Sequence, residues 1–398
     1  NCYYENIKNR VVLDRVDFLK NEVKYSHFFH KNTNIFMMLN SSESQHVQSN
    51  IRVPGDKNLY LVNLCLGELH SFSKAKKNGD FFEFTHQFGP TESYLFATSN
   101  KRLPNVKNKL VNTVINYNKN YRILFKNSWK FRPENLNVLP LTNWSYKLNY
   151  NRDVNPGLNY SYETFIEVEQ VPEKSLLLLH DLFNQAVNGE GGGMYPIEIS
   201  VNGFKLKTID TFIRGEEEFK QNERIETVNY LGRSVLGANV ANIIKKGYNR
   251  ILIKTMGSLF NPLQITYPVL FVGDFSCNKG GRGWVIGKRK VDIGYGSWTE
   301  HGYPFYNGSG VYEQEFEKPG NFSSLILKLG RVEEIAWVTL NNQPIDVLPW
   351  APSEADITPF INEGKNIIGI RVANSHTNIF KMINYPAGLV SEVCLDVY

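Results

Sequence analysis

The sequence predicts an all-β chain of three β-sandwich domains, the last two a tandem pair of jelly rolls, with one short helix at the N-terminus. Three observations support this prediction. The second half of the chain contains an internal repeat, and repeats decide architecture before any single motif does. Apolar and polar residues alternate there in short runs separated by turn signals, as they do in strands. No long amphipathic helix interrupts that half of the sequence.

The internal repeat identifies two equivalent domains. Residues 239–253 (NVANIIKKGYNRILI) are matched by residues 356–370 (DITPFINEGKNIIGI) at a constant offset of 117, which pairs Asn249 with Asn366. Matches farther upstream have larger offsets, and the offset changes only between motifs. The length differences between the two copies therefore lie in the connections between matching segments. These further pairs are Asn202 with Asn341, Tyr162 with Tyr312, and Trp144 with Trp298.

Each copy consists of short strands joined by tight turns. Residues 164–169 and 311–317 alternate between apolar and polar, which places one face of each strand on a core. The apolar runs 176–179 and 325–329 are typical of strands buried in a sandwich. Strands 197–201 and 337–340 each run into a two-residue turn, Asn202-Gly203 or Asn341-Asn342, whose residues tolerate a positive φ.

The repeated segment itself predicts one capped helical turn followed by a strand. Asn239 and Asp356 can accept hydrogen bonds from free amides at the start of that turn. Gly247 and Gly364 can adopt the left-handed conformation needed to leave it. Strand, turn and strand in this order indicate antiparallel jelly rolls, which we place at residues 126–290 and 291–398.

The N-terminal part of the chain predicts a helix and then a smaller sandwich. Residues 9–24 carry apolar side chains at helical spacing, so we expect residues 1–24 to be the helical end of an upstream domain. Residues 25–125 predict a small antiparallel sandwich and a linker toward the first jelly roll. Its expected strands are 34–40, 47–53, 59–64, 81–85 and 93–98, with connecting strands at 111–117 and 121–125.

Composition excludes several classes of function. The net charge of +5 comes from 44 basic and 39 acidic residues that are dispersed, so we expect no nucleic-acid partner. No apolar run reaches the roughly 18 residues of a membrane span. The four cysteines are far apart, so buried apolar roles are expected and no metal cluster. Residue 1 is not Met, and we expect a longer parent protein; extracellular, periplasmic and cytoplasmic locations all stay open.

Two stretches of the C-terminal repeat resemble a known group of enzymes. Residues 296–312 (GSWTEHGYPFYNGSGVY) resemble the "GxW…GYPFYSG…Y" signature in the C-terminal jelly rolls of large bacterial glycoside hydrolases of the α-L-rhamnosidase type. The later "V-NG…W-P…DIT…G-N…GL-G" pattern is similar to that of galactose-binding-like domains in relatives of β-galactosidase and β-glucuronidase. Its matching segments are Val338–Asn342, Trp350–Pro352, Asp356–Thr358, Gly364–Asn366 and Gly388–Val390. Residues 30–40 resemble the sandwich that follows the barrel in these enzymes.

The resemblance is specific for residues 291–398, fair for 126–290 and weak for 1–125. This chain departs from the pattern at Asn342 and Ser391, where such domains carry Gly, and the resemblance therefore implies a divergent member of the group. The resemblance implies an accessory, carbohydrate-binding-like region that braces a catalytic barrel of the same polypeptide, with a glycan or polysaccharide as its partner.

No catalytic residues are predicted within this chain. Glycosidases use two carboxylates, which the resemblance places in a barrel, and a barrel needs about 250 residues of alternating strands and helices. No such stretch is present, so the presumed parent is a glycosidase while the activity of this chain stays uncertain. No cofactor is expected; structural Ca²⁺ occurs in related jelly rolls, but no Asp-x-Asp-x-Asp run supports it here.

Six residues are the candidates for sugar binding, because exposed aromatic rings stack on sugar C–H groups and polar side chains bind hydroxyls. Packing is the competing interpretation, and it is favoured for Trp298 because Trp144 takes the equivalent place in the other repeat. The candidates are Trp298, His301, Tyr303 and Tyr306 in one Gly-rich loop, then Trp350 and His376.

Three hypotheses follow for the whole chain. The first, favoured by the resemblance, is the accessory region of a glycoside hydrolase. The second is a stand-alone carbohydrate-binding protein, which predicts an intact site and independent affinity. The third is a purely structural or adhesive β-sandwich protein.

Overall fold

The computed structural model is composed almost entirely of β-strands, which confirms the all-β prediction. The chain divides into two compact units: unit 1 is Asn1–Asn127, Tyr312–Val372 and Leu389–Tyr398, and unit 2 is Ser128–Val311 and Ala373–Gly388. The structure describes residues 12–15, 23–30, 32–42, 45–55, 57–63, 68–72, 75–89, 92–107, 120–151, 157–180, 196–208, 225–257, 269–281, 283–350 and 353–398.

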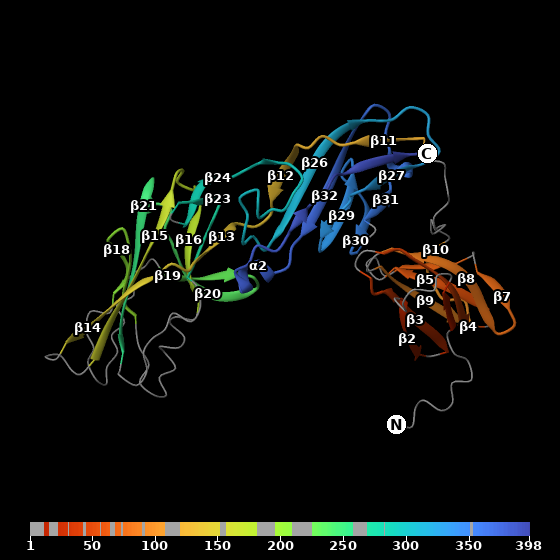
Figure 1. Ribbon diagram of the computed structural model, residues 1–398, viewed down its shortest axis with the longest axis horizontal. Helices are drawn as coiled ribbons and strands as arrows, with labels where there is room; N and C mark the ends of the chain where they lie inside the picture. The colour runs from red at the N-terminus through yellow and green to blue at the C-terminus, as the bar shows by residue number, and fades with distance from the viewer. Residues whose placement is uncertain are drawn as a thin grey trace, which may run out of the picture. The chain divides into compact units, whose positions relative to one another are not determined.

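The N-terminal sandwich, coloured red to orange in Figure 1, contains two sheets that enclose an aromatic core. Phe36, Phe88 and Phe96 are fully buried in it. The first sheet has the order β1 (Val12–Arg15), β4 (Val47–Pro54), β8 (Phe81–Phe88) and β7 (Lys76–Asn78). The second has the order β10 (Val106–Lys107), β6 (Glu68–Ser71), β5 (Asn58–Asn63), β9 (Ser93–Ser99), β3 (Thr33–Asn40) and β2 (Val23–His30). The five strands predicted here are confirmed.

The predicted helix over residues 9–24 is wrong wherever the structure describes it. β1 pairs antiparallel with β4, from Val12 opposite Arg52 to Arg15 opposite Ser49, and residues 23 and 24 open β2. Backbone pairing with β4 therefore overrides the short helical periodicity of this segment. Residues 9–11 and 16–22 lie outside the described residues, as does the predicted strand 111–117.

The middle sandwich lies in unit 2 and is packed with aliphatic side chains. Leu177, Ile199, Ile251 and Phe271 are fully buried between its sheets. One sheet has the order β13 (Asn137–Leu141), β22 (Val269–Gly273), β16 (Ser175–His180), β20 (Arg233–Asn239) and β19 (Ile225–Tyr230). The other has the order β18 (Phe204–Thr208), β17 (Pro196–Val201), β21 (Gly247–Gly257), β15 (Gly157–Val168), β24 (Gly283–Lys288) and β23 (Phe275–Gly280), with β14 (Ser145–Asn151) also paired to β15.

The C-terminal sandwich includes two strands, β11 and β12, that precede the middle sandwich in sequence. One sheet has the order β11 (Tyr121–Leu124), β34 (Cys394–Val397), β27 (Leu325–Lys328) and β31 (Glu354–Asp356). The other has the order β25 (Asp292–Ile293), β12 (Trp129–Pro133), β26 (Ser309–Glu317), β32 (Lys365–Ala373), β29 (Ile335–Leu340) and β30 (Gln343–Leu348). The remaining elements are the pair β28 (Val332–Glu333) and β33 (Gly388–Leu389), the 3-10 turn Thr358–Phe360, and α2 (Thr377–Lys381).

This strand membership differs from the boundaries that the sequence predicted at residues 125 and 290. Residues 121–125 were expected to lead into the first jelly roll, but β11 pairs with β34 near the end of the chain, Tyr121 lying opposite Val397. β12 likewise joins the sheet of β26. The middle sandwich is therefore inserted between strands of the C-terminal one, which a boundary drawn in sequence order cannot reveal.

The sequence repeat corresponds to a repeated network around one buried asparagine. In unit 2, Asn249 Oδ1 accepts hydrogen bonds from Asn202 Nδ2 and the Lys245 amide, each 2.8 Å, and its Nδ2 donates to the carbonyls of Lys245 and Gly247. In unit 1, Asn366 makes the same four bonds. Its partners are Asn341 Nδ2, the Asn362 amide, and the carbonyls of Asn362 and Gly364. Both Asn249 and Asn366 are fully buried.

The turns around these networks also match their predictions. Asn202 and Asn341 have φ of 52° and 51°, and the residues that follow them, Gly203 and Asn342, also have positive φ. β17–β18 and β29–β30 are therefore hairpins with two-residue turns. The caps are present too, since Asn239 Oδ1 accepts from the amide of Ala241 and Asp356 Oδ1 from that of Thr358.

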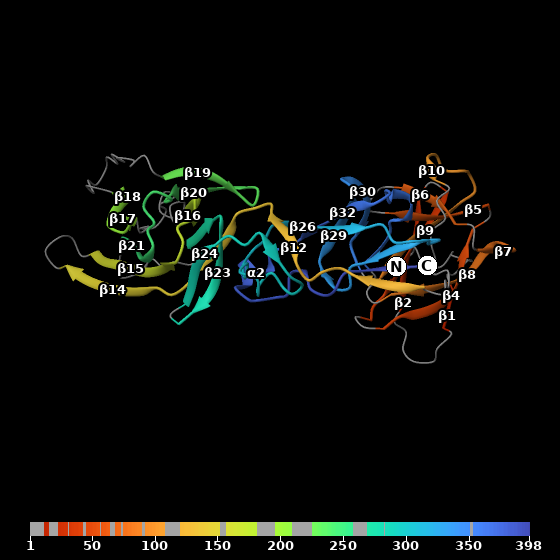
Figure 2. The ribbon, with the colours of Figure 1, turned by 90° about the horizontal axis from the view of Figure 1, so that it is seen from above.

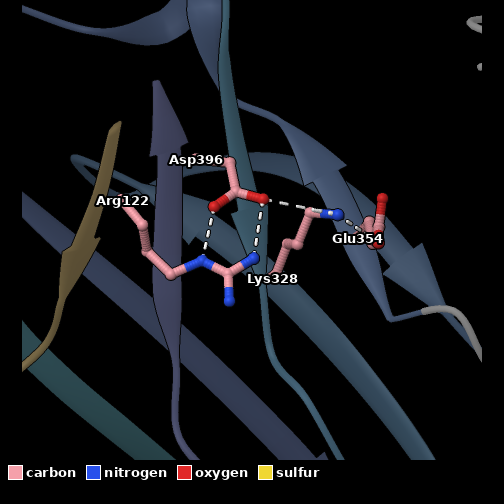
Figure 3. Close-up of polar contacts among 4 residues, drawn as sticks. All are labelled: Arg122, Lys328, Glu354 and Asp396. Atoms are coloured by element: carbon pink, nitrogen blue, oxygen red, sulfur yellow. Dashed lines mark hydrogen bonds and ion pairs between the residues drawn. The ribbon is translucent and has the colours of Figure 1, made fainter. Parts of the chain in front are cut away.

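A buried carboxylate ties β11 to the C-terminal sandwich. The side chain of Asp396 is only 2% exposed and accepts two hydrogen bonds from Arg122, at 2.6 and 3.0 Å. On its other side lies Lys328, 3.5 Å away, which also binds Glu354 at 2.8 Å (Figure 3). The hydrogen bond to Asp396 raises the pKa of Arg122. Burial alone would lower the pKa of Lys328, but the hydrogen bond and charge of Glu354 raise it.

We expect Asn366→Ala to destabilise the C-terminal sandwich by about 2–4 kcal/mol, because it leaves buried amide and carbonyl groups without partners. Hydrogen exchange of peptides over residues 335–372 should speed up. Asn362→Ala is the control, since this exposed residue contributes only its backbone to the network, and it should cost no more than about 0.5 kcal/mol. Equal exchange in the two variants would contradict the role of the buried asparagine.

Asp396→Asn should loosen β11 by about 1–3 kcal/mol, the usual worth of hydrogen bonds to a charged group. The measurement is hydrogen exchange of a peptide that contains residues 121–124. Lys365→Gln serves as the control, because the Lys365–Glu315 pair is 4.0 Å apart and exposed on both sides. Unchanged exchange of β11 in Asp396→Asn would show that sheet pairing alone holds the strand.

Candidate functional site

Three of the six predicted sugar-binding residues form a buried aromatic cluster. Trp298 and Tyr306 are fully buried and Tyr303 is 1% exposed. The ring centroids of Trp298 and Tyr306 are 5.4 Å apart, and those of Tyr303 and Tyr306 are 5.7 Å apart, in edge-to-face arrangements. Phe131 of β12 packs against Trp298 and Tyr303. These rings bury large apolar area within unit 2 and present no face to a ligand.

The polar atoms of this cluster are bound internally as well. The Tyr303 hydroxyl donates to the Lys290 carbonyl at 2.9 Å, and the Tyr306 hydroxyl donates to the Ser309 carbonyl at 2.6 Å. Burial raises the pKa of Tyr303 to about 12. Sugar stacking by Trp298, Tyr303 and Tyr306 is therefore not possible in this structure, and the competing interpretation, packing, explains these three residues.

The other three predicted residues have different surroundings. His301 is half-buried, and its Nε2 lies 3.0 Å from the Tyr295 carbonyl. His376 is exposed just before α2, and the centroid of its ring lies 5.9 Å from that of the Phe380 ring. Trp350 is half-buried in unit 1, next to residues 351–352 outside the described residues. A sugar-binding role for these three stays a prediction.

The middle sandwich carries an open groove of about 510 Å³ that the sequence did not point to. One wall is the edge strand β13 with the turn after it, from Leu139 to Asn143. The floor is Thr164–Glu167 of β15, and the far side is formed by Tyr248 of β21 with Gly283 and Trp284 of β24. All lining residues belong to unit 2.

The groove combines aromatic rings with polar side chains. Phe165 is 55% exposed and Tyr248 is 49% exposed, while Trp284 is half-buried. Glu167 lies directly opposite Tyr248 in the ladder between β15 and β21, and Phe165 is two residues away on the same face. A ring face, a carboxylate and a tyrosine hydroxyl thus share one surface, which is the composition of a small-molecule site.

The rim of the groove is held by local hydrogen bonds. Thr164 Oγ1 donates to the Asn143 carbonyl at 2.8 Å, and Trp144 Nε1 donates to the Leu141 carbonyl at 2.8 Å. These bonds fix the turn between β13 and β14 and leave the Asn143 side chain exposed at the rim. Trp144, the repeat partner of Trp298, therefore also has a structural role, since it packs against the core of the middle sandwich.

Outside the groove, the described residues contain no group of three His, Cys, Asp or Glu side chains that could hold a metal ion.

Glu313, Glu315 and Glu317 are exposed together along β26, the arrangement of a solvated strand surface. Cys277 and Cys394 are buried, as predicted, whereas Cys2 and Cys65 lie outside the described residues. Burial raises the pKa of the Cys277 thiol to about 12. No helix in the described part of the chain is long and apolar enough to cross a membrane.

A buried carboxylate in the N-terminal sandwich has a structural environment. Glu92 is 7% exposed, and burial raises its pKa although hydrogen bonds from the Gly89 amide and the Tyr94 hydroxyl lower it. The Asn40 amide donates to the Glu92 carbonyl, and Asn40 Nδ2 donates to that of Gly89. The carboxylate therefore binds the Gly89 amide, while Asn40 of β3 binds the backbone carbonyls of Gly89 and Glu92 and holds both residues beside that strand.

No family model and no curated protein sequence matches the chain. Among solved structures, a rhamnosidase from Novosphingobium sp. PP1Y is similar with a TM-score of 0.39 and 11% identity, over 97% of this chain and 25% of that one. An α-L-rhamnosidase from Streptomyces avermitilis, complexed with L-rhamnose, is similar with a TM-score of 0.25 and 10% identity. That match covers 92% of this chain and 37% of the other, so the chain spans less than two fifths of either protein.

Glu92→Gln should stabilise the N-terminal sandwich at pH 7. Because the pKa of Glu92 is raised in the folded state, the protonated acid stabilises the fold relative to the carboxylate. That stabilisation is lost as the pH rises through the folded-state pKa. The gain of the variant over the natural protein should therefore shrink as pH falls toward 4.5, the ordinary pKa of the group. Thermal unfolding at several pH values measures this. Glu83→Gln, at a half-buried carboxylate that pairs with Arg52 on the sandwich surface, is the control and should show no such gain in stability.

Proposed function

We propose that this chain is a non-catalytic, glycan-binding region of a glycoside-hydrolase-like protein, and that it braces a catalytic barrel of the same polypeptide. The groove on the middle sandwich is the observation that carries the glycan-binding part of this proposal. The bracing part rests on the resemblance of the C-terminal repeat to jelly rolls of the rhamnosidase type, and the partner is a glycan or polysaccharide.

The groove supplies both kinds of contact that a sugar requires. The apolar C–H face of a pyranose stacks on an aromatic ring, and Phe165 and Tyr248, which line the groove, are each about half exposed. Sugar hydroxyls need hydrogen-bonding groups of both polarities, and Glu167, Asn143 and the Tyr248 hydroxyl provide them at the floor and rim. The volume of about 510 Å³ is within the range of small-ligand sites.

The chemistry of the groove supports binding rather than bond cleavage. Hydrolysis of a glycosidic bond uses two carboxyl groups on opposite sides of it. Glu167 is the only carboxylate among the described residues that line the groove. A single acceptor can orient a hydroxyl, but it cannot act as acid and base at once. The activity therefore belongs to the barrel of the proposed parent protein.

An array of neutral and acidic oligosaccharides, probed with the whole chain, tests the proposal. We expect millimolar or tighter binding of at least one glycan, and Phe165→Ala should weaken it by roughly tenfold, because one stacking ring is lost. Phe204→Ala is the matched control, since Phe204 is 56% exposed on the same sheet but does not line the groove. Absence of any glycan binding would favour a structural β-sandwich protein instead.

A further inference from the structure

The groove lies at a break in the larger sheet of the middle sandwich. β14 pairs with β15 up to Ser145 opposite Glu163, and β24 pairs with it only from Glu167 opposite Val285. Between these points, Thr164–Ile166 have β21 on one side and, among the described strands, no partner on the other. The hairpin of β14 and β15 is visible in Figure 2, where β24 lies farther along β15. The break coincides with the floor of the groove.

The backbone of Phe165 points into this break. Its ladder partner Arg250 donates its amide to Asn202 Oδ1 at 3.0 Å, and the Arg250 carbonyl accepts from the Asn202 amide at 2.9 Å. Both groups of Arg250 therefore face away from β15, which makes Phe165 and Arg250 a non-hydrogen-bonded pair of the antiparallel ladder. The amide and carbonyl of Phe165 consequently face the opposite side, where the sheet is broken.

A hydrogen bond between β15 and β24 indicates independently that the backbone groups of Phe165 face the broken side of the sheet. Glu169 donates its amide to the Ile286 carbonyl at 2.8 Å, toward β24. Backbone groups of alternate residues in a strand point to the same side, so Phe165, four residues before Glu169, also points there. The break thus presents one amide donor and one carbonyl acceptor beside an exposed ring. Two neighbouring hydroxyls of a sugar, which both donate and accept, complement this pair.

The charge of the groove selects among sugars. Among the described residues that line the groove, Glu167 is the only one with a carboxyl group, and none of them is Lys, Arg or His. Two cations near the groove already have partners in the protein. Arg250 forms an ion pair with Glu163, and the Lys279 ammonium lies over the Trp284 ring, 5.8 Å from its centroid. A carboxylate or sulfate on the ligand would meet the Phe165 carbonyl and the Glu167 carboxylate, both of which repel it.

We infer that the break in the sheet beside β15 binds an uncharged sugar unit through the Phe165 backbone and ring, and that Glu167 excludes uronic acids and sulfated sugars. This inference rests on the proposed glycan-binding function. It adds the ligand class and the two groups that select it, neither of which follows from the presence of a groove alone.

The test compares a neutral oligosaccharide retained by the whole chain with the matched oligomer oxidised to a uronic acid at C6, by titration calorimetry. We expect the neutral oligomer to bind at least about tenfold more tightly at low salt. Glu167→Gln should raise the affinity for the acidic oligomer several-fold and shrink this preference. Glu169→Gln, an exposed carboxylate on the same segment that does not line the groove, is the control and should leave the preference unchanged.

A second variant tests the backbone contact. Phe165→Pro removes the amide that faces the break without removing a ladder bond to β21, so it should bind about fivefold more weakly than Phe165→Ala. Unchanged thermal unfolding relative to Phe165→Ala is required before the comparison; if Phe165→Pro fails to fold, the Glu167 comparison decides. Equal or tighter binding of the acidic oligomer, insensitive to Glu167→Gln, overturns the inference while leaving glycan binding intact. No binding of any glycan overturns the proposed function itself.

Discussion

A buried asparagine holds each of the two jelly rolls together at the same point. Asn249 and Asn366 each join a strand to the turn before it through four hydrogen bonds, with no exposed surface. Buried polar groups are costly unless every bond is made, so a fully bonded amide fixes one local geometry. Its neighbours must then follow: a glycine at positive φ, and a second asparagine at the tip of the adjacent hairpin.

This network also determines the candidate site in unit 2. Asn202 is bound by Asn249 and in turn binds both backbone groups of Arg250. Those bonds set which edge of β21 faces β15, and hence which residues of β15 direct their amides toward the break. A structural amide at the hairpin tip therefore fixes the side of β15 to which Phe165 presents its backbone. The equivalent network in unit 1 binds Ile367 in the same way.

The C-terminal sandwich uses its aromatic and ionic groups for cohesion. Trp298, Tyr303 and Tyr306 bury their rings, and the two tyrosine hydroxyls donate to the carbonyls of Lys290 and Ser309, so the most conspicuous aromatic loop of the sequence is part of the core. Asp396, with Arg122 on one side and Lys328 on the other, fixes β11 beside the last strand. These interactions explain how segments separated by the whole middle sandwich form continuous sheets.

The sequence by itself determined the all-β class, the repeat, both hairpin turns and their caps, because each depends on residues close together in the chain. Asn202-Gly203 and Asn341-Asn342 show this, since a positive φ is a local property. Tertiary structure alone decided that residues 12–15 are a strand, that β11 and β12 belong to the C-terminal sandwich, and that Trp298 is buried. It also created the groove, which brings together residues 139 to 284. Strand partners and burial depend on contacts between distant segments, and residue spacing carries no information about them.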